Sequence, residues 1–292
     1  MFLMGEIEMP KALNGVRVLD LTSAYSGPFC SMMLADHGAE VIKIEPPNGD
    51  QARTWGPFDK KSGESAYFAQ INRNKKGVTL NLKSKKAVQM FYDLVKEADV
   101  VIENYRPGIT KKLKIDYDTL KKINPRIIYG SCSGFGQNGP LATHACYDIV
   151  AQSMSGLVSM TGFPDSPPTK VGPCIIDAVS GLFLSLGITL ALYSRIQTGK
   201  GQCVDVAMMD SAMSILENSI VEYTVAGMIP GREGNRDTSI SPFDIYEAKD
   251  GYIALGVGND KLFDKFCKAI HHEELLEDLN FKTNDLRCQN YY

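Results

Sequence analysis

The chain has 292 residues, of which 44% are hydrophobic and 22% are charged, a composition typical of a globular protein with its own core. Its 31 basic and 34 acidic residues give a net charge of −3 at pH 7, which argues against a general nucleic-acid binder or membrane-surface binder. The 7 cysteines include no Cys-x-x-Cys pair, and the 4 histidines have no metal-ligand spacing. We therefore expect free thiols, a cytoplasmic location and no metal site.

Short β-branched runs alternate with helix-like stretches over the first 135 residues. The predicted strands are 16–21, 40–45, 77–82, 99–105 and 126–133, and the predicted helices are 28–37, 84–97 and 109–123. Such alternation is typical of βαβ units, so the sequence predicts an α/β fold with a mostly parallel sheet and helices on both faces.

Longer helices are predicted next, at 147–161 and 177–198, followed by a strand at 202–208 and a helix at 210–223. The window 175–193 is nearly apolar enough for a membrane span, but it contains Asp177 and the two serines Ser180 and Ser185. We therefore predict a buried core helix and no membrane segment. The first residues lack a basic region before an apolar run, so no signal peptide is expected.

Glycine, proline and charge accumulate at 227–237, which marks a linker. A hairpin is predicted at 243–259 around Lys249-Asp250-Gly251, with a helix at 261–270 after it. We divide the chain into a large domain, residues 1–226, and a linker with a partial, smaller α+β domain, residues 227–292.

Three features invite a chemical interpretation, each with a structural alternative. Gly134–Gly139 spells GxGxxG after a strand, but Pro140 follows where a helix should open, so a nicotinamide or flavin site is disfavoured. Arg106 follows a strand and suits a phosphate, or belongs to a solvated basic rim. Asp165 lies in a turn stiffened by prolines. It is either a nucleophile or an ordinary turn residue, and composition alone favours the turn residue.

The ordered segments together resemble the class III CoA-transferases, the group of formyl-CoA, carnitine and glutarate CoA-transferases. The matching stretches are LNGVRVLDLTSAYSGPF, ADHGAEVIKIEPPNGDQAR, INRNKKGVTLNLK, DVVIENYRPG, NPRIIYGSCSGFGQNGP, YDIVAQSMSGLVSMTGFPDSPP, TGKGQCVDVAMMD and DGYIALGVGNDKLF. The resemblance implies a Rossmann-like large domain, a smaller domain and an interlocked homodimer. It also implies acyl-CoA and a small carboxylic acid as substrates, with no permanently bound cofactor.

The same resemblance assigns site residues by position. Tyr25 and Ser26 fall in the first CoA-contacting loop, and Asp165 falls on the nucleophilic aspartate. The adenine and phosphate end is assigned to Leu80, Asn81, Leu82, Lys83, Asn104, Tyr105, Arg106 and Lys112, and the pantetheine to Cys132, Ser133, Gly134 and Phe135. Pro46 replaces an arginine of the family and Ser133 a lysine, so these two contacts differ from the family's pattern.

Two alternatives stay open. The α-methylacyl-CoA racemases of the same family use a histidine and an aspartate, and these positions hold Tyr147 and Asp177 here. A tyrosine of ordinary pKa is a poor exchange base near neutrality, so transfer is favoured. Because family chains usually continue beyond the point where this one stops, the other alternative is a shortened CoA-binding protein without activity.

Overall fold

The computed structural model describes residues 11–291. The chain separates into two compact units. The first comprises Met1–Ser155 and Val171–Glu217, and the second comprises Gly156–Lys170 and Asn218–Tyr292. The second unit thus starts near the predicted boundary at residue 226 and also includes the short segment that carries Asp165. The functional division at residue 226 stays a prediction.

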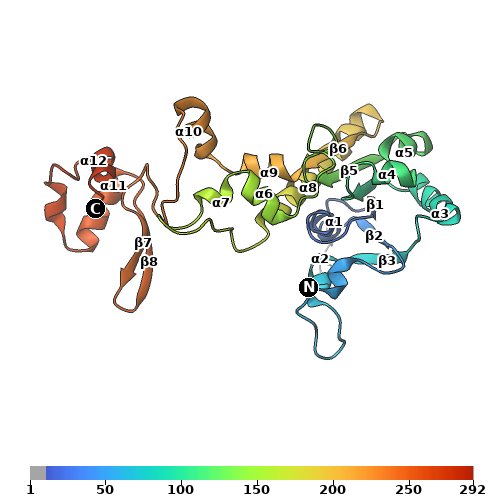
Figure 1. The fold of residues 1–292 in the computed structure, drawn as a ribbon, viewed down its shortest axis with the longest axis horizontal. Helices are drawn as coiled ribbons and strands as arrows, with labels where there is room; N and C mark the ends of the chain where they lie inside the picture. Colours follow the sequence, from blue (N-terminus) through green and yellow to red (C-terminus); the bar gives the residue numbers. More distant parts are fainter. Residues whose placement is uncertain (1–10, 292) are drawn as a thin grey trace, which may run out of the picture. The chain divides into compact units, whose positions relative to one another are not determined.

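A six-stranded sheet forms the centre of the first unit (Figure 1). Its strands are β1 (Arg17–Asp20), β2 (Glu40–Glu45), β3 (Lys75–Thr79), β4 (Val100–Glu103), β5 (Ile128–Ser133) and β6 (Cys203–Ala207). Every neighbouring pair is parallel, in the order β3-β2-β1-β4-β5-β6. This is the order of a Rossmann-like doubly wound sheet, and it confirms the predicted α/β fold. The order reverses between β1 and β4, so the carboxyl ends of these two strands are the expected ligand site.

Helix α3 (Lys85–Lys96) shows how the sequence positions these layers. Its buried residues Ala87, Phe91 and Val95 recur every four positions, which places them on one face of the helix. This face contributes to a core cluster with strand residues such as Leu19 and Val101. Burial of such apolar side chains contributes about 1.5–3 kcal/mol each, so this face holds α3 against the sheet.

Several predicted helices are interrupted where the backbone becomes left-handed. The predicted helix 109–123 divides into α4 (Ile109–Leu113) and α5 (Tyr117–Ile123), because Lys114 has φ 59°. The predicted helix 147–161 divides at Gly156 into α6 (Asp148–Met154) and α7 (Leu157–Met160). The predicted helix 210–223 becomes α9 (Met208–Ser214) and α10 (Asn218–Ala226), and β3 begins two residues before the predicted strand. Apolar spacing does not reveal such breaks, since it continues across one left-handed residue.

The first unit also contains α1 (Ser26–Asp36), α2 (Ala66–Ile71), the short 3₁₀ helix η1 (Gln51–Thr54) and the long helix α8 (Ile175–Thr198). By length and composition α8 is apolar enough to cross a membrane, and 39% of its most apolar window is buried. Its small residues lie against neighbouring elements: a Cβ on Gly181 would lie 2.6 Å from the carbonyl oxygen of Ser26. Such close approach is typical of a core helix. Leu182, Leu186 and Leu190 are exposed.

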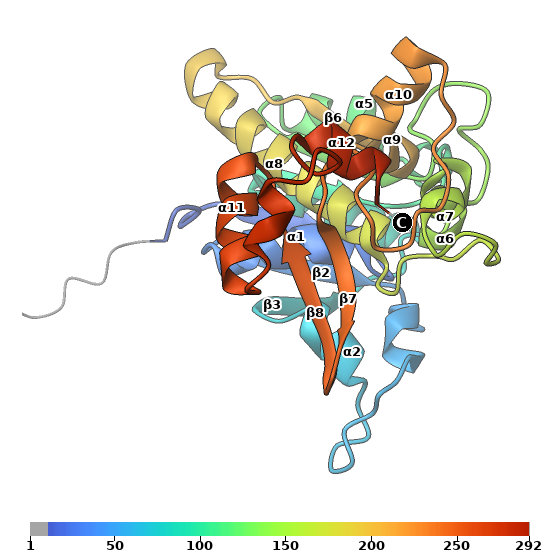
Figure 2. The same cartoon turned by 90° about the vertical axis from the view of Figure 1, so that its left-hand side faces the viewer.

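The second unit contains an antiparallel hairpin of β7 (Phe243–Ala248) and β8 (Gly251–Gly256), drawn in orange in Figure 2. Helix α11 (Asp260–Ala269), the 3₁₀ helix η2 (Glu273–Leu276) and α12 (Asn284–Gln289) follow it. A small core forms around Val257, Phe263 and Cys267. The predicted hairpin and the helix after it are confirmed, and the unit is α+β.

Candidate active site

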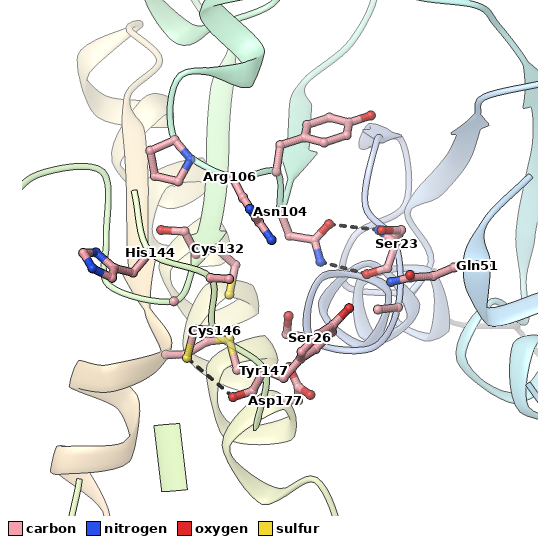
Figure 3. Close-up of a pocket in the computed structure, with 17 residues that line it drawn as sticks. Ser23, Ser26, Gln51, Asn104, Arg106, Cys132, His144, Cys146, Tyr147 and Asp177 are labelled. Carbon is pink, nitrogen blue, oxygen red and sulfur yellow. Dashed lines mark hydrogen bonds between the residues drawn. The ribbon is translucent and has the colours of Figure 1, made fainter. Parts of the chain in front are cut away.

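Two cavities lie where the strands of the first unit end. The central cavity has a volume of about 270 Å³ and is shown in Figure 3. Its walls come from the segments after β1, β4 and β5, from residues 144–147, and from the start of α8 and α9. The second, largely apolar cavity has a volume of about 340 Å³, and Tyr105 lines both. The central cavity therefore occupies the point where the strand order reverses.

Buried ion pairs hold the segment that follows β1. The Asp20 carboxylate is fully buried and contacts Lys75 Nζ at 3.0 Å, and it accepts hydrogen bonds from Ser31 and Thr22. Lys75 and Lys43 keep the pKa of the Asp20 carboxyl far below its usual range, against the effect of burial. Lys43 Nζ in turn donates to the carbonyl oxygen of Thr22 at 2.8 Å. Because the side chains of both lysines are buried, this segment is fixed by charges that water screens little.

The segments after β1 and β4 are joined by one side-chain amide. Asn104 Oδ1 accepts from the Ser23 backbone N–H at 2.9 Å, and Asn104 Nδ2 donates to the Ser23 carbonyl at 2.8 Å (Figure 3). Arg106, two residues further on, is exposed. Its guanidinium group has no hydrogen bond or ion pair within residues 11–291. The cavity therefore has a rigid rim with one cation available to an anionic ligand.

The structure brings most of the predicted binding residues together at these cavities. The central cavity is lined by seven of them: Ser26, Asn104, Tyr105, Arg106, Cys132, Ser133 and Gly134. The apolar cavity adds Leu80, Asn81, Leu82, Lys83 and Lys112, and Pro46 is also in its wall. Tyr25 and Phe135 line neither cavity: Tyr25 stacks on Phe29, and Phe135 packs edge-on against His144. The role of each residue stays a prediction.

The Ser133 hydroxyl is a second group that suits a ligand. Ser133 is only 7% exposed and lines the central cavity. Its Oγ is buried and has no hydrogen-bond partner within the described part of the chain. A buried hydroxyl without a partner is costly, so a polar atom of a bound molecule would stabilise it.

Asp177 is a cavity residue that the sequence analysis assigned only to the aspartate position of a racemase. Burial and the nearby Asp148 raise the pKa of the Asp177 carboxyl to about 7, while Ser26 opposes this shift. Asp148 is itself buried and accepts the backbone N–H groups of Ile176 at 2.8 Å and Asp177 at 3.2 Å. The two acids are 29 positions apart in the chain, so no local pattern pairs them. Near neutral pH, Asp177 is therefore able to donate or accept a proton in the cavity.

Asp165 belongs to the second unit, in an exposed turn between α7 and the Val171 segment. Its backbone is left-handed with φ 62°, a conformation that aspartate tolerates better than most residues. The turn is held by a hydrogen bond from Gly234 N to Gly162 O at 2.9 Å, and Arg232 donates to Ser159 O at 3.1 Å. Within residues 11–291 the Asp165 carboxylate has no hydrogen bond or ion pair, so its oxygens are free to react.

Comparison with known proteins identifies the family. The model of CoA-transferase family III matches residues 13–291, almost the whole chain. The chain belongs to this family. Members with similar sequences include an acetyl-CoA:oxalate CoA-transferase of Acetobacter aceti, 44% identical over 95% of this chain and 71% of its own length. A mouse succinyl-CoA:glutarate CoA-transferase is 41% identical over 96% of this chain and 64% of its own length.

Solved structures of family members show the same fold. A CAIB/BAIF family protein from Brucella suis matches with a TM-score of 0.85 and 39% identity, covering 97% of this chain and 76% of that one. A protein from M. tuberculosis matches with a TM-score of 0.87 and 33% identity, and the match covers 96% of this chain and 75% of that protein. The chain thus spans about two thirds to three quarters of the length of these relatives.

Proposed function

We propose that this chain is a CoA-transferase that moves CoA from an acyl-CoA donor to a small carboxylic acid, with Asp165 as nucleophile. The observation that carries the proposal is the pair of cavities at the carboxyl ends of the strands, which combine the Arg106 cation with an adjoining apolar space. The similarity to the CoA-transferases of Acetobacter aceti and mouse supports it. Acyl-CoA is then a substrate and not a resident cofactor.

The two cavities match the chemistry of coenzyme A. Its phosphate groups carry negative charge, its adenine has flat aromatic faces that pack on apolar side chains, and its pantetheine arm offers amide groups. Arg106 would meet a phosphate through charge-assisted hydrogen bonds. The apolar cavity, with Leu80, Leu82 and Lys112 in its walls, would accept the adenine and a further phosphate. The unpaired Ser133 hydroxyl would meet an amide of the pantetheine arm.

The proposed reaction begins at Asp165. Its carboxylate oxygen attacks the thioester carbonyl carbon, the C–S bond breaks, and CoA leaves as a thiolate, so the protein holds a mixed aspartyl anhydride. The acceptor must leave as a CoA thioester and the donor as a free acid. The CoA thiolate then attacks the Asp165 carbonyl carbon of the anhydride, which releases the donor acid and leaves Asp165 as a CoA thioester. The acceptor carboxylate displaces the thiolate from this thioester and forms a second anhydride. The thiolate finally attacks the acceptor's carbonyl carbon, so the acceptor leaves as a CoA thioester and the Asp165 carboxylate is regenerated. Water must be excluded throughout, because it would hydrolyse the anhydride.

The acceptor is proposed to be a small dicarboxylic acid. The names of the relatives specify oxalate and glutarate, which are both of this class. We also propose a cytoplasmic homodimer, consistent with seven free cysteines in the described chain and with the exposed leucines of α8. Light scattering during gel filtration measures the mass in solution and tests the dimer directly.

A transfer assay distinguishes this function from the alternatives. The protein is incubated with succinyl-CoA and a panel of dicarboxylic acids, and new CoA thioesters are identified by mass spectrometry. If the protein is a transferase, the CoA thioester of the added acid should form, and an equimolar amount of succinyl-CoA should disappear. Exchange of the α-proton of a branched acyl-CoA in D₂O, without transfer to any acid, would instead support a racemase that uses Asp177. CoA binding without either reaction would support a binding protein.

Replacing Arg106 with alanine is expected to weaken CoA binding by about 10- to 100-fold, the loss typical of a charge-assisted contact to phosphate. Isothermal calorimetry measures the dissociation constant. Arg126→Ala is the matched control, because Arg126 lies before β5, at the opposite end of that strand from the cavity. An unchanged dissociation constant in the Arg106 variant would remove the phosphate role.

A further inference from the structure

Glu103 is a buried carboxylate that the proposed reaction does not use. It is the last residue of β4, only 2% exposed, and lies in register with Ser131 of β5. Its Oε1 accepts a hydrogen bond from Ser131 Oγ at 2.5 Å, and its Oε2 accepts from the backbone N–H of Tyr105 at 2.8 Å. Glu103 thus fixes the first turn of the chain segment that carries Asn104, Tyr105 and Arg106.

The environment of Glu103 differs from that of the other buried acids near the same strand ends. Asp20 pairs with Lys75, Asp50 with Lys43, and Glu45 with Arg53. Glu103 forms no ion pair within residues 11–291. The titratable groups that interact with it are neutral or acidic: Tyr105, Tyr129, Cys132, Cys203 and Asp205. Burial, and to a smaller degree Asp205, raise the pKa of the Glu103 carboxyl to about 7, although Ser131 and the Tyr105 N–H oppose this.

The hydrogen-bond network continues from Glu103 to the glycine turn. Gln137 Nε2 donates to Ser131 Oγ at 2.7 Å, and the Gln137 backbone N–H donates to Asp205 Oδ2 at 2.9 Å. Gln137 lies inside the turn that starts at Gly134, which lines the central cavity. One carboxylate is therefore connected to two walls of the cavity, the segment after β4 and the turn after β5.

Protonation of Glu103 changes the hydrogen bonds of this network. An ionised carboxylate accepts from both the Ser131 hydroxyl and the Tyr105 N–H. A proton on Oε2 would face the Tyr105 N–H, and a proton on Oε1 would compete with the Ser131 hydroxyl. The neutral acid therefore accepts more weakly at one oxygen, or donates to Ser131 Oγ and displaces the serine proton from this contact.

We propose that Glu103 is a positioning residue for acyl-CoA: its ionised carboxylate holds the Asn104–Arg106 segment and, through Ser131 and Gln137, the glycine turn in the arrangement that binds the ligand. This inference rests on the proposed function. It predicts that binding favours the ionised form, so the affinity for CoA rises with pH through about 7, and the ionised fraction grows about tenfold between pH 6 and pH 8.

The test compares the dissociation constant of CoA for the wild type and Glu103→Gln by calorimetry from pH 6 to pH 8. Glutamine keeps the size of the side chain but offers one acceptor oxygen, so it resembles the protonated acid. For an ionised form that binds about tenfold more tightly, the ratio of the variant's constant to the wild-type constant is expected to be about two at pH 6 and about nine at pH 8. Titration of the CoA phosphate affects both proteins alike and cancels in this ratio. In transfer assays at pH 8, the variant should raise KM for acyl-CoA and leave kcat near the wild-type value.

Asp177→Asn is the matched control, because Asp177 also has a carboxyl with a raised pKa near 7 and lies in the cavity wall. A ratio that stays constant with pH for Glu103→Gln would overturn the positioning role. Loss of the pH dependence in Asp177→Asn would then assign it to Asp177. Failure of the wild type to bind CoA at any pH would instead overturn the proposed function itself.

Ser131→Ala provides a second variant should Glu103→Gln fold poorly. Removing the Ser131 hydroxyl removes a hydrogen bond that favours the ionised form of Glu103, so the midpoint of the pH profile should move to higher pH. A midpoint that does not move, in folded protein, would contradict the proposal.

Discussion

Replacing Asp165 with asparagine is expected to reduce CoA transfer by at least about 1000-fold, because an amide oxygen is a far weaker nucleophile than a carboxylate. The dissociation constant of CoA should change little, since free CoA lacks the acyl carbon that Asp165 is proposed to attack and the residues proposed to bind CoA line the two cavities of the first unit. The initial rate of succinyl-CoA consumption with an acceptor acid measures the effect. Thermal unfolding should also be nearly unchanged, as the Asp165 side chain has no hydrogen bond or ion pair in the described chain.

Asp250→Asn is the matched control for this experiment. Asp250 is likewise an exposed turn aspartate of the second unit, at the tip of the β7–β8 hairpin, where asparagine before glycine suits the turn. Its transfer rate should equal that of the wild type. A transfer rate of Asp165→Asn within a few-fold of the wild type would show that another group forms the covalent intermediate.

Replacing Lys75 with methionine is expected to lower the free energy of unfolding by about 3–5 kcal/mol. Lys75 is buried, and its loss leaves the fully buried Asp20 carboxylate with fewer compensating charges. Lys75 also donates to the carbonyl oxygen of Pro28 and to Asn72, which lose these bonds as well. Denaturant unfolding monitored by circular dichroism measures the change. CoA affinity should fall too, because Asp20 fixes Thr22 at the start of the cavity rim.

The pH dependence of this effect follows from the Asp20 carboxyl, whose folded-state pKa is depressed by Lys75 and Lys43. A carboxyl with a depressed folded-state pKa stabilises the folded protein at pH values above its unfolded-state pKa of about 4. This stabilisation is lost as the pH falls from about 4 towards the folded-state pKa. The difference in the free energy of unfolding between the wild type and Lys75→Met should therefore be largest at neutral pH and smaller at acidic pH. Lys76→Met is the control: Lys76 is next in the chain but exposed, so its variant should unfold like the wild type. Equal stability of the two variants would contradict the account of Asp20.

The sequence predicted the fold well because its hydrophobic runs are short, β-branched and regularly spaced. All six strands of the sheet were expected, and the largest shift is at β3, which begins at Lys75 because the polar Asn72–Lys76 stretch carries the buried Lys75. Helix breaks at Lys114, Gly156 and Glu217 were missed, since each depends on one residue with a left-handed backbone. Apolar periodicity is insensitive to a single residue of this kind.

The candidate site was predicted in part, and chiefly through the family resemblance. That resemblance located the segments that line the two cavities, including Asn104, Arg106 and Ser133. It did not indicate that Asp177 and Glu103 have raised pKa values, because each shift depends on burial and on distant partners such as Asp148 and Asp205. The sequence also gave no sign of the Asp20–Lys75 pair, whose members are 55 positions apart. Electrostatics of this kind arises only from the folded arrangement.

The central claim is that Asp165 forms a covalent acyl intermediate. Its most direct test is intact-protein mass spectrometry of the chain mixed with succinyl-CoA, followed by hydroxylamine trapping and peptide mapping. The account predicts a hydroxamate on the peptide that contains Asp165, and none in Asp165→Asn. Folded protein that binds CoA and transfers it to an acceptor acid, with no trapped label or with the label on another residue, would contradict the account.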